Sequence, residues 1–228
     1  MIIKISEIKR QAKQSLKGNW GLVVLLTFIL FLINAVLPNA IDIIMNGGFT
    51  TRINQDQTSF SADMVSLLVS IVLIPLSVTV YWFYLSLIRN EQPQISQVFS
   101  NLKDIKKFLK LLGLSFLQHL LVFLWSFLLV VPGIVKALAY SQSYYLLRDH
   151  PEYSVIQAIT ESRMRMKGYK WKYFLLGLSF IGWGILCLFT LGIGLLWLIP
   201  YIATSIATFY NELIYPQDKK FKNKEAIL

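Results

Sequence analysis

Hydrophobic residues in this chain gather into long runs that are separated by short polar and basic segments. The runs cover residues 20–37, 64–88, 111–131, 132–147 and 173–215. A helix needs roughly 20 mainly apolar residues to cross a hydrocarbon core about 30 Å thick, and the last run is long enough for two such helices. The pattern therefore predicts an all-α, polytopic membrane protein with six transmembrane helices. Residues 39–63 are expected to form its longest external loop.

Three short segments place apolar residues at helical spacing on one face and basic residues on the others. They cover about 6–17, 96–107 and 154–167. In the first segment, Ile8, Ala12 and Leu16 form the apolar stripe. In the third, Ser154 and Gln157 have the spacing of a capping box, which stabilises the start of a helix. Basic amphipathic helices of this kind lie in the membrane interface, so we expect three interfacial helices.

The same order of features occurs three times along the chain. Ile74–Pro93, Val131–Pro151 and Ile199–Asp218 each begin with an apolar residue and a proline and end in a polar exit. Each follows another hydrophobic run, and each pair of runs follows a basic segment. Self-similarity of this kind predicts a repeat architecture. We expect three hairpin units, about 5–93, 94–151 and 152–215, in one membrane domain of residues 1–215, followed by a polar, basic cytoplasmic tail at 216–228.

Proline and small residues predict the shape and packing of the second helix in each unit. Proline removes an intrahelical hydrogen bond, so bends are expected near Pro75, Pro132 and Pro200. Small residues recur behind two of these prolines, and they are Gly133, Ala137 and Ser141, then Ala203 and Ala207. Small residues at four-residue spacing let helices approach closely within lipid, so these positions are expected at helix contacts.

The distribution of charge predicts the orientation. Hydrophobic residues make up 55% of the chain and charged residues only 15%, unlike a typical soluble domain. Of the 22 Lys and Arg residues, all but Arg52 and Lys136 fall on one side of a six-helix arrangement. The positive-inside rule then places both termini in the cytoplasm. Attraction to an anionic inner leaflet accounts for the net charge of +10 without a nucleic-acid partner.

The basic N-terminal segment and the run after it could also form a secretory signal peptide. The basic segment is long and has helical periodicity, however, and no A-x-A cleavage site follows the apolar run before Pro38. A membrane-anchored N-terminus is therefore the favoured interpretation. Cys187 is the only cysteine, so no intrachain disulfide can form.

Ionisable residues inside apolar runs are functional candidates, because burying a charge in lipid is costly. Lys136 could line a functional site, or it could extend to the external interface or answer carbonyls freed by Pro132. His119 could relay protons, or it could hydrogen-bond a neighbouring helix. Glu212 is the third candidate. Counted from the repeat prolines, Glu212 and Lys136 differ in depth by about 12 Å, so an ion pair between them is not expected.

The sequence predicts no catalytic, cofactor-binding or metal-ligating residue. His119 and His150 are the only histidines and Cys187 is isolated, so no zinc-binding set is evident. A phosphate loop, a nucleophile elbow, a metalloprotease helix and a pair of catalytic carboxylates are all missing from the sequence. We therefore expect a protein that is not an enzyme.

Several motifs resemble a known family. They include Leu16-Lys17-Gly18-Asn19-Trp20, Pro132-Gly133, Met166-Lys167-Gly168, Phe180-Ile181-Gly182-Trp183 and Gly192-Ile193-Gly194. Together they resemble the bacterial integral membrane proteins grouped as domain of unknown function 975, over nearly the whole chain. Where that family has Asp-Asn-Pro after the fourth span, this chain reads Asp149-His150-Pro151. The resemblance implies a multi-pass protein of the bacterial plasma membrane, and it implies no substrate and no catalytic residue.

Three classes of function are compatible with these features. A non-enzymatic protein that supports or regulates a membrane or envelope partner needs only a helical bundle with a basic cytoplasmic face. A small-solute or lipid transporter needs polar groups at mid-membrane depth, of which this chain has few. A membrane enzyme needs a catalytic set. The first class is favoured and the transporter is the alternative. The expected partners are the anionic inner leaflet and either another membrane protein or a second copy of the chain.

Overall fold

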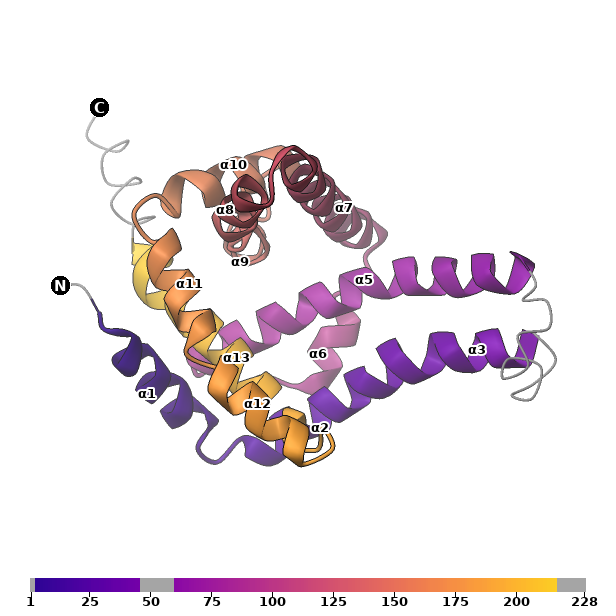
Figure 1. The fold of residues 1–228 in the computed structure, drawn as a ribbon, viewed down its shortest axis with the longest axis horizontal. Helices are drawn as coiled ribbons and strands as arrows, with labels where there is room; N and C mark the ends of the chain where they lie inside the picture. Colours follow the sequence, from indigo (N-terminus) through magenta and orange to yellow (C-terminus); the bar gives the residue numbers. More distant parts are fainter. Residues whose placement is uncertain (1–2, 46–59, 217–228) are drawn as a thin grey trace.

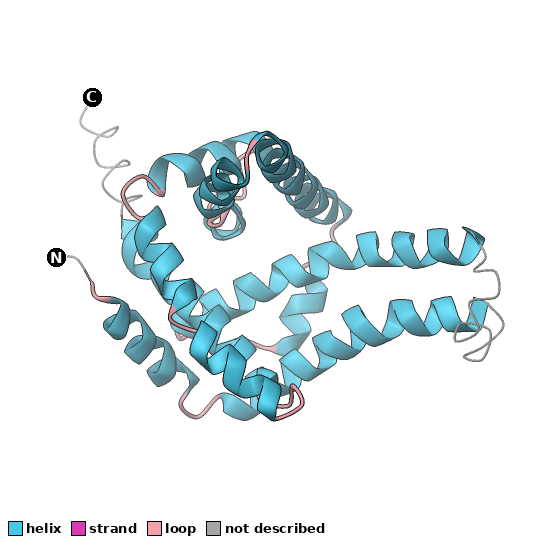
Figure 2. Ribbon diagram, in the orientation of Figure 1, coloured by secondary structure: helices cyan, strands magenta, loops and turns pink. Residues whose placement is uncertain are grey.

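The computed structural model describes residues 3–45 and 60–216, and within these ranges every regular element is a helix (Figures 1 and 2). The centre of the expected external loop (46–59) and nearly all of the expected tail (217–228) lie outside the described residues. The predicted all-α class is confirmed for the described residues. The helices form three long arms and three short flanking helices.

The first arm is a long helical hairpin that extends away from the rest of the molecule (Figure 1). Its outgoing helix consists of α2 (Trp20–Phe31), a π-helical turn η1 (Leu32–Val36) and α3 (Leu37–Met45), and its return helix is α5 (Phe60–Ile88). The expected loop bounds of 39–63 are therefore wrong at both ends, because α3 continues to Met45 and α5 already begins at Phe60. The wider π-helical turn lies directly before Pro38, where the helix must continue without one backbone N–H donor.

The second arm is α7 (Ile105–Leu128), α8 (Val130–Tyr140) and α9 (Ser143–Asp149). A single extended residue, Leu129, reverses the chain between α7 and α8. Pro132 therefore lies in the first turn of α8, where a backbone N–H has no intrahelical partner. The bend expected at Pro132 is wrong for this reason, whereas Pro75 and Pro200 both lie inside their helices.

The third arm is α11 (Lys170–Leu178) and α12 (Ile181–Phe189), followed by α13 (Leu195–Phe209) and a π-helical end η2 (Tyr210–Ile214). The turn between α12 and α13 contains Leu191 and Gly192, both at positive φ. Glycine adopts such angles without strain, which suits it to this tight reversal.

The three short helices lie beside the arms. They are α1 (Ile5–Leu16), α6 (Ile95–Ser100) and α10 (Val155–Arg165). The second is shorter than the expected 96–107, because residues 101–104 form turns and Asp104 caps α7 by accepting a hydrogen bond from the Lys106 backbone. The capping box of Ser154 and Gln157 is confirmed. Helix α6 contacts α5, α10 contacts all three helices of the second arm, and α1 contacts α13.

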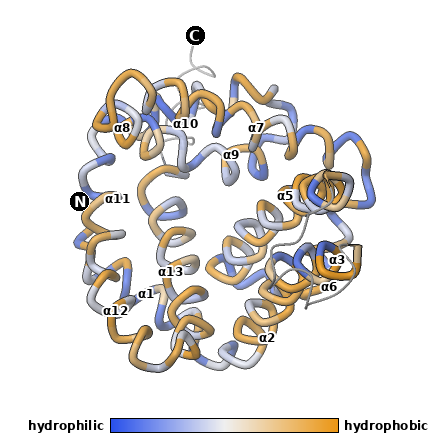
Figure 3. Tube along the Cα trace, turned by 45° about the vertical axis from the view of Figure 1, so that its right-hand side comes forward, coloured by the Kyte–Doolittle hydropathy of each residue, from blue (hydrophilic) through white to orange (hydrophobic). Residues whose placement is uncertain are grey.

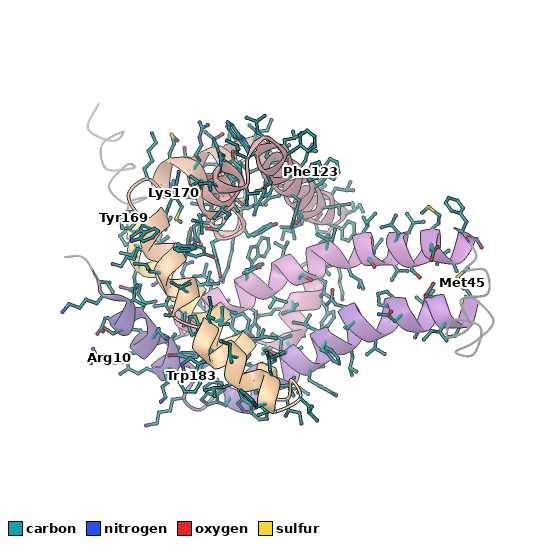
Figure 4. The ribbon with its side chains drawn as sticks, viewed as in Figure 1. Arg10, Met45, Phe123, Tyr169, Lys170 and Trp183 are labelled. Carbon is teal, nitrogen blue, oxygen red and sulfur yellow. The ribbon has the colours of Figure 1, made fainter. Side chains whose placement is uncertain are left out.

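Four helical segments are long and apolar enough to cross a membrane: Trp20–Met45, Phe60–Ile88, Ile105–Leu128 and Lys170–Phe189. Figure 3 shows hydrophobic residues along most of α2 and α12, and Figure 4 shows side chains such as Phe123 and Trp183 on the outside of their helices. The remaining two expected spans fall on shorter or more polar helices. Residues 132–147 are interrupted by a turn at 141–142, and residues 195–215 include buried Thr204, Ser205 and Thr208. Six crossings stay a prediction.

The largest buried cluster joins α1, α2, α5, α9 and α13. Ile8, Ala12 and Leu16 of α1 are fully buried, so the predicted stripe of the first short helix faces protein. A second cluster joins the second arm to α10 and to Val78 of α5. These two clusters bring the ends of α5, α9 and α13 together at one end of the molecule.

Candidate functional site

The return helices of the three arms meet at a network of polar side chains. Arg89 follows α5, Asp149 ends α9, and Tyr210 and Asn211 begin η2. The Arg89 guanidinium donates from Nη1 and Nη2 to the two carboxylate oxygens of Asp149, both at 2.7 Å. The Tyr210 hydroxyl donates to the same carboxylate at 2.7 Å, and Arg89 Nε donates to Asn211 Oδ1 at 3.1 Å. We call these four residues the junction cluster.

The junction cluster is largely shielded from water. The side chains of Arg89 and Asp149 are 19% and 9% exposed, and the guanidinium also lies 4.5 Å from the centre of the Tyr215 ring. Burial opposes the charge of Arg89, but the hydrogen bond and negative charge of Asp149 outweigh it and raise the pKa of Arg89 above its ordinary value. A bidentate Arg–carboxylate pair is strong and geometrically specific. The pair therefore fixes the ends of α5 and α9 relative to each other.

A second ion pair, between Arg148 and Glu91, lies close to the first. Arg148 directly precedes Asp149, and Glu91 is two residues after Arg89. Arg148 Nη2 donates to Glu91 Oε2 at 2.6 Å and to the Ser86 hydroxyl at 2.7 Å. Arg148 Nη1 donates to the backbone carbonyl of Trp82 at 2.7 Å. Ser86 in turn donates to Glu91 at 2.9 Å. Two consecutive residues of α9 are thus bound to the C-terminal end of α5.

An open pocket of about 400 Å³ adjoins this second pair, between α5, α6, α7 and α9. We call it the α5–α7 pocket. Its charged lining residues are Lys107, Lys110, Arg148 and Glu91, and its apolar lining includes Phe83 and Leu111. Three positively charged residues and one negatively charged residue line this pocket, so it suits an anionic group.

The three candidates from the sequence lie apart from this pocket and from one another. Lys136 lies 4.2 Å from the centre of the Trp125 ring, beside a smaller pocket of about 280 Å³ between the second arm and α10. His119 is exposed, and its Nδ1 lies 2.7 Å from the Ser115 carbonyl of its own helix. Glu212 is half-buried and accepts a hydrogen bond of 3.4 Å from Asn211. Only Glu212 adjoins the junction cluster.

The small residues predicted at helix contacts differ in burial. A Cβ atom added to Gly133 would lie 2.8 Å from Ser126 Cα, so α7 and α8 are in very close contact there. Ala207 is fully buried in the main core, whereas Ala137, Ser141 and Ala203 are half-buried. Ser141 donates from its hydroxyl to the Leu138 carbonyl of the preceding turn at 2.9 Å.

Sequence reasoning missed the charged residues of both ion pairs. They are Arg89, Glu91, Arg148 and Asp149, and they stand in the polar exits of the first two proline-led runs. One signal could have found them: Asp149 begins the Asp-His-Pro sequence that resembles the family motif. Pairing residues so distant along the chain requires the tertiary arrangement, because a charge in a polar exit is more often solvated.

The other chemistry-bearing residues do not form a reactive set. His150 stacks on Tyr153 at 4.4 Å between ring centres, and its Nδ1 lies 2.9 Å from Glu152 Oε1. Within residues 3–45 and 60–216, no three His, Cys, Asp or Glu side chains lie close enough to hold a metal ion. The single cysteine, Cys187, is buried.

Fold and site together define an all-helical protein with four helices able to cross a membrane. Ion pairs join its first and second arms, and hydrogen bonds from Tyr210 and Asn211 join the third arm to them. The chain belongs to the family described as "Protein of unknown function (DUF975)", which it matches over residues 1–138 and 128–215. The resemblance seen in the sequence is therefore confirmed. Neither the curated proteins nor the solved structures give a match.

Proposed function

We propose that this chain is a non-enzymatic integral membrane protein of the bacterial plasma membrane that supports or regulates a membrane or envelope partner. Its three arms are hairpins that cross the membrane six times, with both termini in the cytoplasm. The observation that carries this proposal is the junction cluster. Its charged groups hold the helices of this chain together, which supports a structural use of these side chains rather than a catalytic one.

Equivalent positions in the first and third flanking helices support a relationship between the first and third repeat units within this proposal. Positions 150 residues apart in α1 and α10 have the same environment: Ile8 and Ala158, Ala12 and Ser162, and Leu16 and Met166 are all fully buried. Each helix is followed by a Lys-Gly pair whose glycine has positive φ, +85° at Gly18 and +82° at Gly168. Both helices thus present one face to protein, and their exposed basic residues, Arg10 and Lys13 in α1 and Arg163 in α10, remain for the inner leaflet.

Site-specific photo-crosslinking in living cells tests the supporting role. A photoreactive residue at exposed Leu25 or Leu68 should give one discrete adduct with another membrane protein or with a second copy of the chain. The same residue at Leu26, which is fully buried, is the matched control and should give none. Loss of the chain should then lower the level or activity of the protein identified in the adduct. A diffuse smear of adducts at all exposed positions would contradict the proposal.

A lipid or small-solute transporter is the second candidate function, and the open α5–α7 pocket favours it. Reconstituted vesicles with a fluorescent lipid in the inner leaflet distinguish the two functions. A scaffold leaves the lipid in its leaflet, whereas a transporter of lipid makes it accessible to an external quencher. Transport by the wild-type protein that is lost on filling the pocket with Ser86→Trp would replace the first proposal.

A further inference from the structure

We propose that the α5–α7 pocket is a binding site for a phosphate-bearing group. Such a group can come from the headgroup of an anionic phospholipid or from a soluble phosphate ester. The pocket lies where α5 ends and α7 begins, and its charged side chains come from α7, α9 and the residues that follow α5. Its volume of about 400 Å³ is within the range of small-ligand sites.

The charge balance of the pocket favours an anion over a cation. Lys107, Lys110 and Arg148 line it together with a single carboxylate, Glu91. Guanidinium groups match the geometry of phosphate oxygens, and lysines add compact positive charge beside them. The Glu91 carboxylate already accepts hydrogen bonds from Arg148 at 2.6 Å and from Ser86 at 2.9 Å. The charges of Lys107 and Lys110 therefore give the pocket a net positive charge.

Two of the cations are held in place by neutral partners from other elements. Arg148 donates to the Trp82 carbonyl and to the Ser86 hydroxyl, and these bonds fix the plane of its guanidinium. Lys110 Nζ donates to the Pro151 carbonyl at 2.5 Å, which ties the start of α7 to the turn before α10. Side chains that are already positioned lose less conformational entropy on binding, and this raises affinity for a ligand that fits.

The lining is amphipathic, which suits a phosphate attached to a glycerol or other short carbon chain. Gln97, Ser100 and Asn101 contribute polar groups, while the buried side chains of Phe83, Val98 and Leu111 form an apolar wall. Ligand sites of this type combine a mostly apolar lining with a few polar groups that orient the ligand. The lipid source rests on the proposed membrane topology, whereas a soluble phosphate ester does not need it.

The test measures binding to the full-length protein in nanodiscs of neutral phosphatidylcholine. Phosphatidylglycerol is added to the bilayer in one arm, and glycerol phosphate or inorganic phosphate is added to the solution in the other. The test variant is Lys107→Gln with Lys110→Gln. The matched control is Lys103→Gln with Lys106→Gln, which removes the same charge from neighbouring lysines that do not line the pocket. Thermal melting of each variant verifies its fold.

Bound phosphatidylglycerol is counted by native mass spectrometry, and soluble phosphates by calorimetry. We expect the test variant to bind about tenfold or more weakly, since it loses two charge-assisted contacts, and the control to change by about twofold or less. Binding only in the lipid arm identifies a headgroup site, and binding in the soluble arm identifies a phosphate-ester site. An equal loss in both variants, or no binding of any probe to the wild-type protein, overturns the inference. Fractionation with the membrane is measured separately, so a failure here is distinguishable from a failure of the proposed function.

Discussion

At the scale of single residues, the low exposure of Arg89 and Asp149 in the junction cluster determines how much each contributes to stability. Arg89 and Asp149 lie far apart in the sequence, yet they share two hydrogen bonds of 2.7 Å in a shielded place. A buried pair of this kind adds little net stability compared with apolar residues of the same size. Removing one partner, however, leaves the other charge buried without compensation.

We therefore expect Asp149→Asn to destabilise the protein by about 3 kcal/mol, the low end of the range for breaking a buried ion pair, because this pair is partly exposed. Thermal unfolding in detergent measures this effect. Glu7→Gln is the control, because Glu7 pairs with Arg10 on the surface, where such pairs contribute little. The double variant Arg89→Leu, Asp149→Leu should lose less stability than the sum of the losses of Arg89→Leu and Asp149→Leu measured singly. Additive losses would show that the two residues act independently.

Tyr210→Phe tests the third member of the cluster. The change removes only the hydroxyl that donates to Asp149 at 2.7 Å, and the ring keeps its stacking on Tyr145. We expect a loss of about 1 kcal/mol, the usual value for one buried hydrogen bond. An unchanged melting temperature would mean that Arg89 alone satisfies the carboxylate.

At the scale of elements, the contact between α7 and α8 depends on the lack of a side chain at one position. A Cβ atom at Gly133 would lie 2.0 Å from Ser126 Oγ and 2.8 Å from Ser126 Cα. The first of these atoms can rotate away, but the second belongs to the backbone. Gly133→Ala should therefore force the helices apart and cost about 1–3 kcal/mol. Gly182→Ala is the control, since nothing lies within 4 Å of its added Cβ, and it should be neutral or slightly stabilising.

The turns between α7 and α8 and between α12 and α13, which form the ends of the second and third arms, are apolar. A loop exposed to water would be polar. Phe127, Leu128, Leu129, Val130 and Val131 are 65% to 84% exposed, and Leu191 is 94% exposed. A contiguous exposed patch of this kind indicates contact with a membrane or a partner. The ends of these arms are therefore expected to lie in the membrane.

Cysteine labelling on a Cys187→Ser background tests this expectation. Phe127→Cys and Ile193→Cys should react slowly with a charged maleimide and readily with a membrane-permeant one. Gln55→Cys, in the polar connection of the first arm, should react readily with both. Equal rates at Phe127 and Gln55 would place the end of the second arm in water.

At the scale of the whole molecule, the ion pairs join the first two arms at one end, and Tyr210 and Asn211 join the third arm to them. In the sequence, most basic residues lie in the segments that flank the apolar runs at this end. The positive-inside rule then predicts that this end faces the cytoplasm. Gln97→Cys and Ser154→Cys, in or beside α6 and α10, should be labelled by an impermeant reagent only after the cells are opened. Labelling of either position from outside intact cells would contradict the predicted orientation.

The sequence by itself determined the helical class, the start of α10 at its capping box and the approximate ends of α1 and α10, which lie within two residues of the predicted bounds at 17 and 167. Each of these features depends on residues that are close together in the chain. The local signals are the periodic spacing of hydrophobic residues, a capping box and a glycine at positive φ. It also predicted an apolar face on α1, because an amphipathic stripe requires a partner surface.

Only the tertiary structure decided where the arms meet and which charges pair. Arg89, Asp149 and Tyr210 come from three different arms, so no local pattern links them. Pro132 and Pro38 show the same limit on a smaller scale. The effect of a proline depends on where its missing N–H falls in a helix. Pro132 lies in the first turn of α8, and Pro38 lies just after a π-helical turn, and neither location is evident from the sequence alone. The α5–α7 pocket likewise depends on tertiary structure, because its lining residues come from α5, α6, α7 and α9.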